Sequence, residues 1–203
     1  MSTKKIYIVR HGETEFNKKG IVQGSAVNSS LNDTGLEQAD AFYQAYKHIT
    51  FDVVYTSALN RSIESVQAFI DQAVPHCIRP GLNEISWGDM DGKLATAEEH
   101  NEYKELLQRW KEGDIDFKMW GGESPVDVQN RQKPVVEEML NSIHETLLVC
   151  MHGRAIRILL SLLTDSCLSK MDQFEHANLC LYVLEVQNGV ISISHSNDQK
   201  HLG

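Results

Sequence analysis

The sequence predicts an α/β fold with three layers, in which a mainly parallel β-sheet lies between two layers of helices. Short apolar runs alternate with longer segments of helical periodicity, as in chains of βαβ units. Near the C-terminus, Asn188-Gly189 separates two β-rich runs and indicates an antiparallel hairpin. A chain of 203 residues suits one domain of this kind, so we expect residues 1–203 to form a single domain.

Five runs of apolar and β-branched residues predict the strands of this sheet. Each run is short and is bounded by polar or turn-forming residues, which is typical of buried strands. The predicted strands span residues 6–9, 51–56, 146–151, 179–186 and 190–194.

Five segments with apolar residues at helical spacing predict the helices. Ser124 followed by Pro125 is typical of a helix start, and Asn32 or Asp33 is suited to cap the first long helix. Pro134 lies inside its segment and should kink or interrupt that helix. The predicted helices span residues 34–48, 58–73, 94–112, 124–144 and 154–163.

The stretch 88–123 interrupts the alternation of strands and helices. It is polar, helical in pattern and contains tryptophan. We interpret it as a helical insertion over one edge of the sheet. Ligands of such sheets bind beyond the carboxyl ends of the strands, so this insertion is expected to cap the substrate.

The composition narrows the class of protein. The formal net charge is −9, which disfavours a nucleic-acid partner or an anionic membrane surface. The four cysteines form no Cys-x-x-Cys pair and have no zinc-ligand spacing with a histidine. The apolar run at 6–9 is too short for a secretion signal or a membrane span. We therefore expect a cytoplasmic protein that binds neither nucleic acid nor membrane.

Basic and imidazole side chains follow three of the predicted strands. Arg10 and His11 end the first strand, and His152 ends the third. Arg61 lies one helical turn beyond the second. Because parallel strands end at one edge of the sheet, these side chains should converge there. Such positive charge needs an anion, and arginine forks match phosphate oxygens. Helix N–H groups just after His11 and His152 would add donors for the same anion.

Each of these residues also has an ordinary structural interpretation. A single histidine at a strand end is usually structural, and a single arginine near a helix start usually lies on the surface. Three such strand ends together make that interpretation improbable. The other seven histidines have no comparable context, and we treat them as surface or core residues. They are His48, His76, His100, His144, His176, His195 and His201.

The ordered motifs of the chain resemble those of the histidine phosphatase superfamily, in its broad-specificity phosphatase branch. This superfamily also includes the phosphoglycerate mutases, and its fold is the α/β architecture described above. Arg-His-Gly alone is a weak signal, whereas the ordered set is specific. The matching segments are 8–17, 23–24, 31–39, 56–61, 83–92, 121–124 and 151–153.

The resemblance implies a phosphoryl-transfer site. His11 is the implied nucleophile and Glu84 the implied general acid, with Glu13 as a nearby rival for the acid role. The implied phosphate- and substrate-binding residues are Arg10, Asn17, Gln23, Gly24, Arg61, His152 and Gly153. Imidazole attacks phosphorus only through an unprotonated nitrogen, and neighbouring arginines disfavour its protonation. We expect no cofactor and no metal, since the arginines supply the charge that a cation would bring.

Three functions remain open at this point. We favour a phosphatase that hydrolyses a small phosphorylated metabolite and releases inorganic phosphate. Phosphoglycerate mutases of the family have a long insertion after the equivalent of Glu84, with paired arginines for the substrate carboxylate. Here only residues 85–151 separate Glu84 from His152. The arginines of this segment, Arg109 and Arg131, do not form an Arg-Arg pair. A mutase is one alternative, and a non-catalytic protein that binds a phosphorylated ligand is another.

The organic part of the substrate cannot be identified from the sequence. Four aromatic residues near the insertion either contact the substrate or form the insertion's own core, and we favour the core. They are Trp87, Tyr103, Trp110 and Trp120. We interpret Arg154 as facing solvent at its helix start. The C-terminal hairpin would leave an edge strand for pairing, so a homodimer stays open.

Overall fold

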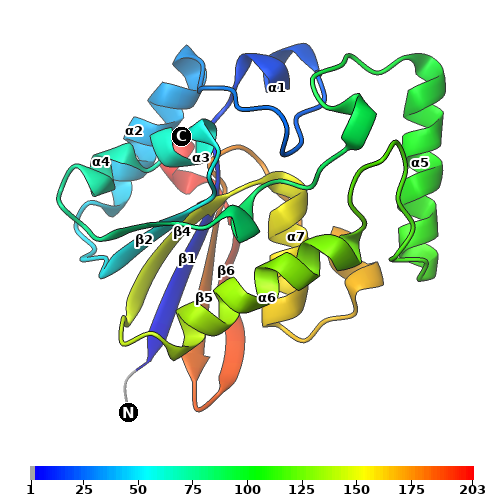
Figure 1. Cartoon of the computed structure of the whole chain (residues 1–203). Coiled ribbons are helices and arrows are strands. Elements are labelled where there is room, and N and C mark those ends of the chain that lie inside the picture. The colour runs from blue at the N-terminus through cyan, green and yellow to red at the C-terminus, as the bar shows by residue number, and fades with distance from the viewer. Residues whose placement is uncertain (1–2) are drawn as a thin grey trace.

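The computed structural model describes residues 3–203 and contains one six-stranded mixed sheet (Figure 1). Its strand order is β3-β2-β4-β1-β5-β6, and the sheet is mainly parallel with an antiparallel pair at one side, as predicted. The strands are β1 (Lys4–Arg10), β2 (Val53–Thr56), β3 (His76–Ile78), β4 (Thr146–Met151), β5 (Leu181–Gln187) and β6 (Val190–Asp198).

The register of the parallel strands brings their carboxyl ends to one edge. Arg10 at the end of β1 pairs with Met151 at the end of β4, and Thr56 at the end of β2 pairs with Cys150 of β4. β5 runs antiparallel to β1, so its first residues lie at this same edge. The residues that follow β1, β2 and β4 and those that precede β5 therefore surround one region.

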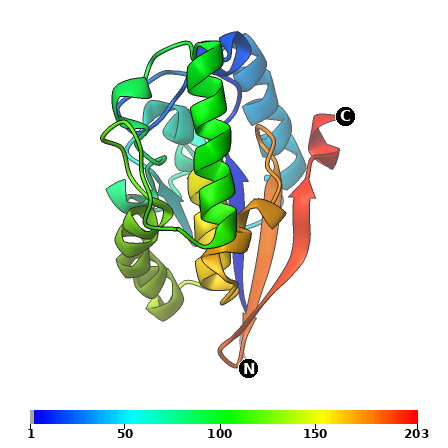
Figure 2. The same cartoon turned by 90° about the vertical axis from the view of Figure 1, so that its right-hand side faces the viewer.

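Helices cover both faces of the sheet (Figures 1 and 2). Alternate residues of β1 point to opposite faces: Ile6 and Ile8 pack with α6 and α7, while Val9 packs with α2 and α4. The helices are α1 (Glu15–Lys19), α2 (Asp33–Tyr46), α3 (Asn60–Glu64), α4 (Gln67–Ile70), α5 (Ala97–Glu112), α6 (Pro125–Asn141) and α7 (Gly153–Leu163), with 3-10 turns at Pro80–Leu82, Gly88–Met90, Leu168–Gln173 and Lys200–Leu202.

The single helix predicted over 58–73 is divided into α3 and α4. The Ser65 hydroxyl donates to the Arg61 carbonyl at 2.6 Å and accepts from the Gly12 N–H at 2.9 Å. Val66 then leaves the helical conformation, with φ −125° and ψ 13°. A serine that bonds main chain from two elements competes with helix continuation, which explains the break.

Helix α6 begins as predicted but is not interrupted at Pro134. Ser124 is its N-cap, and its hydroxyl accepts from the Asp127 N–H at 3.2 Å in a capping box. Pro134 removes the N–H that would bond the Asn130 carbonyl, yet both residues are exposed. The missing bond therefore falls on the solvent side of the helix, where it is tolerated, and the helix continues.

The stretch 88–123 forms the helical insertion expected from the sequence, and α5 is its main element (Figure 2). Leu106 and Trp110 of α5 are buried against Ile158 of α7 and Met171 of the 3-10 turn at Leu168–Gln173. The insertion thus packs beside the N-terminal half of α7. No helix among residues 3–203 combines the length and the hydropathy needed to cross a bilayer.

Candidate active site

His11 lies in the loop after β1 and is buried. Its backbone N–H donates to the Met151 carbonyl at 3.0 Å, which ties the loop to the end of β4. Its Nδ1 lies 2.7 Å from the Gly12 carbonyl oxygen. Because a carbonyl only accepts, the proton is on Nδ1 and the lone pair on Nε2. The main chain thereby fixes the tautomer with a nucleophilic Nε2.

His152 faces His11 across the site, with 5.2 Å between ring centroids. It is the N-cap residue of α7, and its Nε2 lies 2.7 Å from the Ser57 hydroxyl. Its Nδ1 is buried and has no hydrogen-bond partner among the described residues. A buried polar atom without a partner is costly, so this nitrogen is suited to bind a ligand group.

Both imidazoles are held in the neutral form. Burial lowers the pKa of His11 well below its ordinary value, and the charges of Arg10 and Arg61 lower it further. Burial lowers the pKa of His152 in the same direction, with Arg61 as the next cause. Neutrality at His11 Nε2 is the condition for nucleophilic attack.

Arg61 is fully buried, and its guanidinium is oriented by main-chain carbonyls. Nη1 donates to the Val27 carbonyl at 2.5 Å and Nη2 to the Gly24 carbonyl at 3.3 Å. Nε is buried without a partner among residues 3–203. Burial lowers the pKa of Arg61 to about 10, against an opposing influence of Glu84, so the side chain remains a cation at neutral pH.

Arg10 supplies a second cation to the same region. Its Nη1 lies 3.3 Å from Nδ1 of His176, and its buried Nε has no partner among the described residues. In the part of the chain that the structure describes, neither Arg10 nor Arg61 forms an ion pair with a carboxylate. A buried cation, Arg61, beside the partly buried Arg10, with no carboxylate paired to either among the described residues, makes an anion-binding site.

Glu84 is buried beside these groups at the N-terminus of α7. Its Oε1 accepts from the N–H groups of Ile85 and Ala155 at 2.9 Å each, and Oε2 accepts from the Arg154 N–H at 3.1 Å. The first N–H groups of α7 therefore bind Glu84. The sequence had assigned the N–H groups of this helix start to an anion ligand, and for Arg154 and Ala155 that prediction is wrong.

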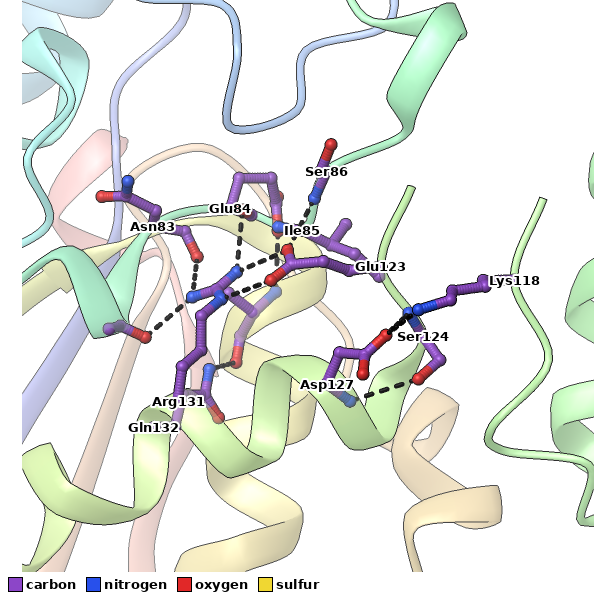
Figure 3. A network of polar contacts seen from close by, with 12 residues as sticks. Asn83, Glu84, Ile85, Ser86, Lys118, Glu123, Ser124, Asp127, Arg131 and Gln132 are labelled. Carbon is purple, nitrogen blue, oxygen red and sulfur yellow. Dashed lines mark hydrogen bonds and ion pairs between the residues drawn. The ribbon is translucent and has the colours of Figure 1, made fainter. Parts of the chain in front are cut away.

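Arg131 holds the segment that carries Glu84 (Figure 3). Its guanidinium donates to the carbonyls of Gly81, Asn83 and Glu84 at 2.8–2.9 Å. It also forms an ion pair with Glu123 at 2.8 Å, and the Glu123 carboxylate accepts from the Ser86 N–H. The sequence suggested no such role for Arg131. Its position in α6, opposite a loop rich in carbonyls, becomes apparent only in three dimensions.

The loop after His11 is ordered by side-chain hydrogen bonds. Thr14 caps α1, and its hydroxyl accepts from the Asn17 N–H at 3.1 Å and from Gln23 Nε2 at 2.7 Å. Glu13 accepts from the Asn32 amide at 2.8 Å, at the start of α2. Gly24 approaches Asp91 and the Ile85 carbonyl so closely that a Cβ atom would lie 2.1 and 2.6 Å from their oxygens. Only glycine fits there.

A comparison with known proteins identifies the family. Residues 6–199 match the profile of the histidine phosphatase superfamily (branch 1). The chain belongs to the histidine phosphatase superfamily.

Relatives within this superfamily include both phosphatases and mutases. Phosphoserine phosphatase 1 of Hydrogenobacter thermophilus is 29% identical over 201 residues, covering 98% of this chain and 94% of its own length. A 2,3-bisphosphoglycerate-dependent phosphoglycerate mutase of Parvibaculum lavamentivorans is 31% identical over 163 residues, with 76% and 77% coverage. A phosphoserine phosphatase from Entamoeba histolytica, solved with phosphoserine, superposes with a TM-score of 0.82 at 26% identity over 98% of this chain and all of that one.

Two further residues of this histidine phosphatase site were missed in the sequence. The His176 ring packs on Gly153, where an added Cβ would lie 2.8–2.9 Å from ring atoms, and its Nδ1 faces Arg10. Burial and then Arg10 lower the pKa of His176 to about 3. Asn178 donates to the His11 carbonyl at 3.0 Å. Both precede β5, and the antiparallel hairpin could have signalled that this segment returns to the same edge.

Arg154 is buried, with 7% of its surface exposed, so the prediction that it faces solvent is wrong. Its guanidinium pairs with Asp172, lies 3.2 Å from the Tyr103 hydroxyl and sits over the Trp110 ring at 5.6 Å. The insertion and the 3-10 turn at Leu168–Gln173 cover this side chain. That coverage depends on tertiary packing that no local pattern reveals.

Of the four aromatic residues named from the sequence, Trp87 contacts both Tyr103 and Trp110. Trp110 is fully buried, stacks on Trp87 with 6.1 Å between centroids, and donates from its ring nitrogen to the Phe117 carbonyl. Tyr103 meets Trp87 edge-on, with a centroid distance of 5.4 Å. Within residues 3–203, no group of three or more His, Cys, Asp or Glu side chains is arranged to hold a metal ion.

Proposed function

We propose that the protein is a phosphomonoester hydrolase that works through a phosphohistidine at His11. The observation that carries this proposal is the environment of His11: a buried neutral imidazole with its lone pair on Nε2, beside two arginines that lack a carboxylate partner among the described residues. A phosphate ester brings the missing anion to the nucleophile. Its reacting phosphorus atom would then face Nε2 of His11.

Arg10, Arg61 and His152 bind the transferring phosphoryl group in this proposal. A phosphoryl transition state spreads negative charge over three equatorial oxygens, and fixed donors stabilise it without reorganisation. The unpartnered nitrogens are Arg10 Nε, Arg61 Nε and His152 Nδ1. Asn17, Gln23, Gly24 and Gly153 would line the same pocket, as the family resemblance implies.

The reaction then proceeds in two transfers. Nε2 of His11 attacks phosphorus, the bond to the leaving oxygen breaks, and the carboxyl group of Glu84 donates a proton to that oxygen. In the second step Glu84 takes a proton from water as the water oxygen attacks phosphorus. The phosphorus–nitrogen bond breaks, and inorganic phosphate leaves.

Hydrolysis is favoured over mutase activity by the two arginines that lie between Glu84 and His152 in the sequence. Arg109 pairs with Asp114 and lies on the Phe117 ring at 3.3 Å, and Arg131 binds Glu123 and main-chain carbonyls. Both guanidinium groups are committed within the protein. Neither is left to bind the carboxylate of a phosphoglycerate, which a mutase must hold while it returns the phosphoryl group.

We also propose that turnover needs no metal ion and that the protein acts in the cytoplasm on a small phosphorylated metabolite. The positive charge of Arg10 and Arg61 serves the purpose that a divalent cation serves in other phosphatases. All four cysteines are free thiols, in keeping with a reducing compartment. A homodimer through the edge strand β6 stays a prediction, which light scattering can test.

The deciding experiment measures hydrolysis of a phosphomonoester panel together with mass-spectrometric detection of phosphate on His11. The wild-type protein should release inorganic phosphate and carry transient phosphohistidine. His11→Ala should lose both yet still bind inorganic phosphate. His48→Ala, which removes an exposed histidine, is the matched control and should remain active. A wild-type protein that binds phosphate but hydrolyses no ester would instead establish the non-catalytic binding function.

A further inference from the structure

We propose that a pocket under the insertion receives the leaving group of the substrate, and that this leaving group is apolar, with an aromatic ring the best fit, and carries no second anion. This inference rests on the proposed function and specifies its substrate class. The pocket has a volume of about 210 Å³. Its wall is mainly apolar and includes Val22, Trp87, Met90, Tyr103 and Trp120.

The pocket adjoins the phosphate site at two points. Gln23 belongs to its wall and donates to the Thr14 hydroxyl, in the loop that follows His11. Tyr103, also in the wall, lies 3.2 Å from the guanidinium of Arg154, whose backbone N–H donates to Glu84. Gln23 thus connects the wall of this pocket to the loop after His11, and Tyr103 connects it through Arg154 to Glu84.

Trp120 is held in this wall by an unusual main-chain conformation. Its φ is +54°, in the left-handed region that bulky residues rarely adopt. Its carbonyl oxygen accepts from the Asp89 N–H at 2.8 Å, and its ring nitrogen donates to Glu102 at 3.1 Å. Strain of this kind persists where the surroundings enforce it, and it is concentrated at functional sites.

The size of the pocket limits the leaving group. An apolar protein cavity of roughly 150 Å³ admits benzene, whereas drug-sized ligands occupy pockets of roughly 300 Å³ or more. A volume of about 210 Å³ thus accommodates one ring with a small substituent.

The charges around the pocket disfavour a second anion. No lysine or arginine lines it, and the charged residue in its wall is Glu99. The Thr96 main chain and hydroxyl lower the pKa of Glu99, which keeps this carboxylate ionised at neutral pH. Arg154 and Arg157 lie nearby on α7, but both pair with Asp172. Among residues 3–203, the wall itself therefore offers a carboxylate or second phosphate one anionic residue and no lysine or arginine, while Lys93 lies near Glu99 outside the wall.

The test compares three esters whose leaving groups are all primary alkoxides, so that leaving-group basicity differs little. They are benzyl phosphate, ethyl phosphate and 3-phosphoglycerate. We expect kcat/KM for benzyl phosphate to exceed that for ethyl phosphate by about tenfold, with 3-phosphoglycerate the poorest of the three. Trp120→Ala should abolish the preference for benzyl over ethyl phosphate.

A second variant keeps the test independent of Trp120. His100 is exposed and lies in the pocket wall, and His100→Arg would place a cation there without disturbing the N-terminal cap of α5. This change should raise kcat/KM for 3-phosphoglycerate several-fold relative to that for ethyl phosphate. His48→Arg, an exposed histidine away from the pocket wall, should change neither value.

The outcomes separate this inference from the proposed function. If ethyl phosphate is hydrolysed but benzyl phosphate is no better, or 3-phosphoglycerate is preferred, the pocket inference is overturned while the phosphatase stands. If no ester is hydrolysed, the phosphatase proposal fails, and calorimetry on the wild-type protein still decides the pocket. Benzyl phosphate must then bind about tenfold more tightly than ethyl phosphate, and equal affinities would overturn the inference.

Discussion

Replacing His176 with glutamine should remove part of the protein's sensitivity to acid. The imidazole is packed between Gly153 and Arg10, and burial and then Arg10 lower its pKa from 6.5 to about 3. In the unfolded chain this histidine regains its ordinary pKa. Between these two values the unfolded state binds a proton that the folded state does not, so acid favours unfolding.

The size of this effect follows from the shift. Each pH unit in that window costs about 1.4 kcal/mol of folding free energy per histidine. Above pH 6.5 both states are neutral and the term vanishes; it grows as the pH falls toward about 3. Between pH 7 and pH 5, His176 alone should lower the folding stability by about 2 kcal/mol. Glutamine at this position does not titrate and should contribute no such loss.

Urea unfolding at pH 7 and at pH 5, followed by tryptophan fluorescence, measures the difference. Between pH 7 and pH 5, the free energy of unfolding should fall by about 2 kcal/mol more in the wild-type protein than in His176→Gln. His11 and His152 also have lowered pKa values, but they are present in both proteins and cancel. His48→Gln, at an exposed site, should behave as wild type. Equal losses in wild type and His176→Gln would refute the buried, neutral imidazole.

Three other outcomes test the site. Glu84→Gln should lower kcat on ethyl phosphate by about 10²- to 10⁴-fold in steady-state assays. The loss should be far smaller on 4-nitrophenyl phosphate, because its leaving group needs no proton. Equal losses of kcat on the two esters would contradict the acid role. Arg131→Gln should lower the free energy of unfolding by about 2–3 kcal/mol in urea and reduce kcat through the displaced Glu84 segment. A chelator should leave turnover unchanged, and a loss restored by Mg²⁺ would overturn the metal-free mechanism.

The parts of the fold that the sequence predicted are those with strong local patterns. The apolar run 146–151 is β4 itself, and Asn188-Gly189 forms the turn between β5 and β6. β3 was missed because it has three residues, none of them fully buried, and depends on pairing with β2. The break at Ser65 was missed because its cause, a bond from Gly12, lies 53 positions away in the chain.

The residues of the candidate site also divide into those that a sequence pattern predicted and those that it did not. Arg10, His11, Arg61 and His152 could be predicted to converge because the carboxyl ends of parallel strands share an edge, and the structure brings them to one region. His176 was not predicted because it precedes a strand, whereas the argument from parallel strands concerns only the residues that follow their carboxyl ends. Its location depends on the direction of β5. The predicted hairpin was the only sequence pattern that indicated this direction.

The position of Glu84 explains how one carboxylate can work beside a phosphate. Two anions at close range repel each other, and a low-dielectric site makes the repulsion stronger. Here the N-terminus of α7, with its partial positive charge, donates two N–H groups to Glu84, and Arg131 fixes the main chain below. The helix therefore holds the carboxylate, and the phosphoryl group is left to side chains. In the proposed mechanism, this division of donors keeps Glu84 in place beside the leaving group while Arg10, Arg61 and His152 bind the phosphoryl group.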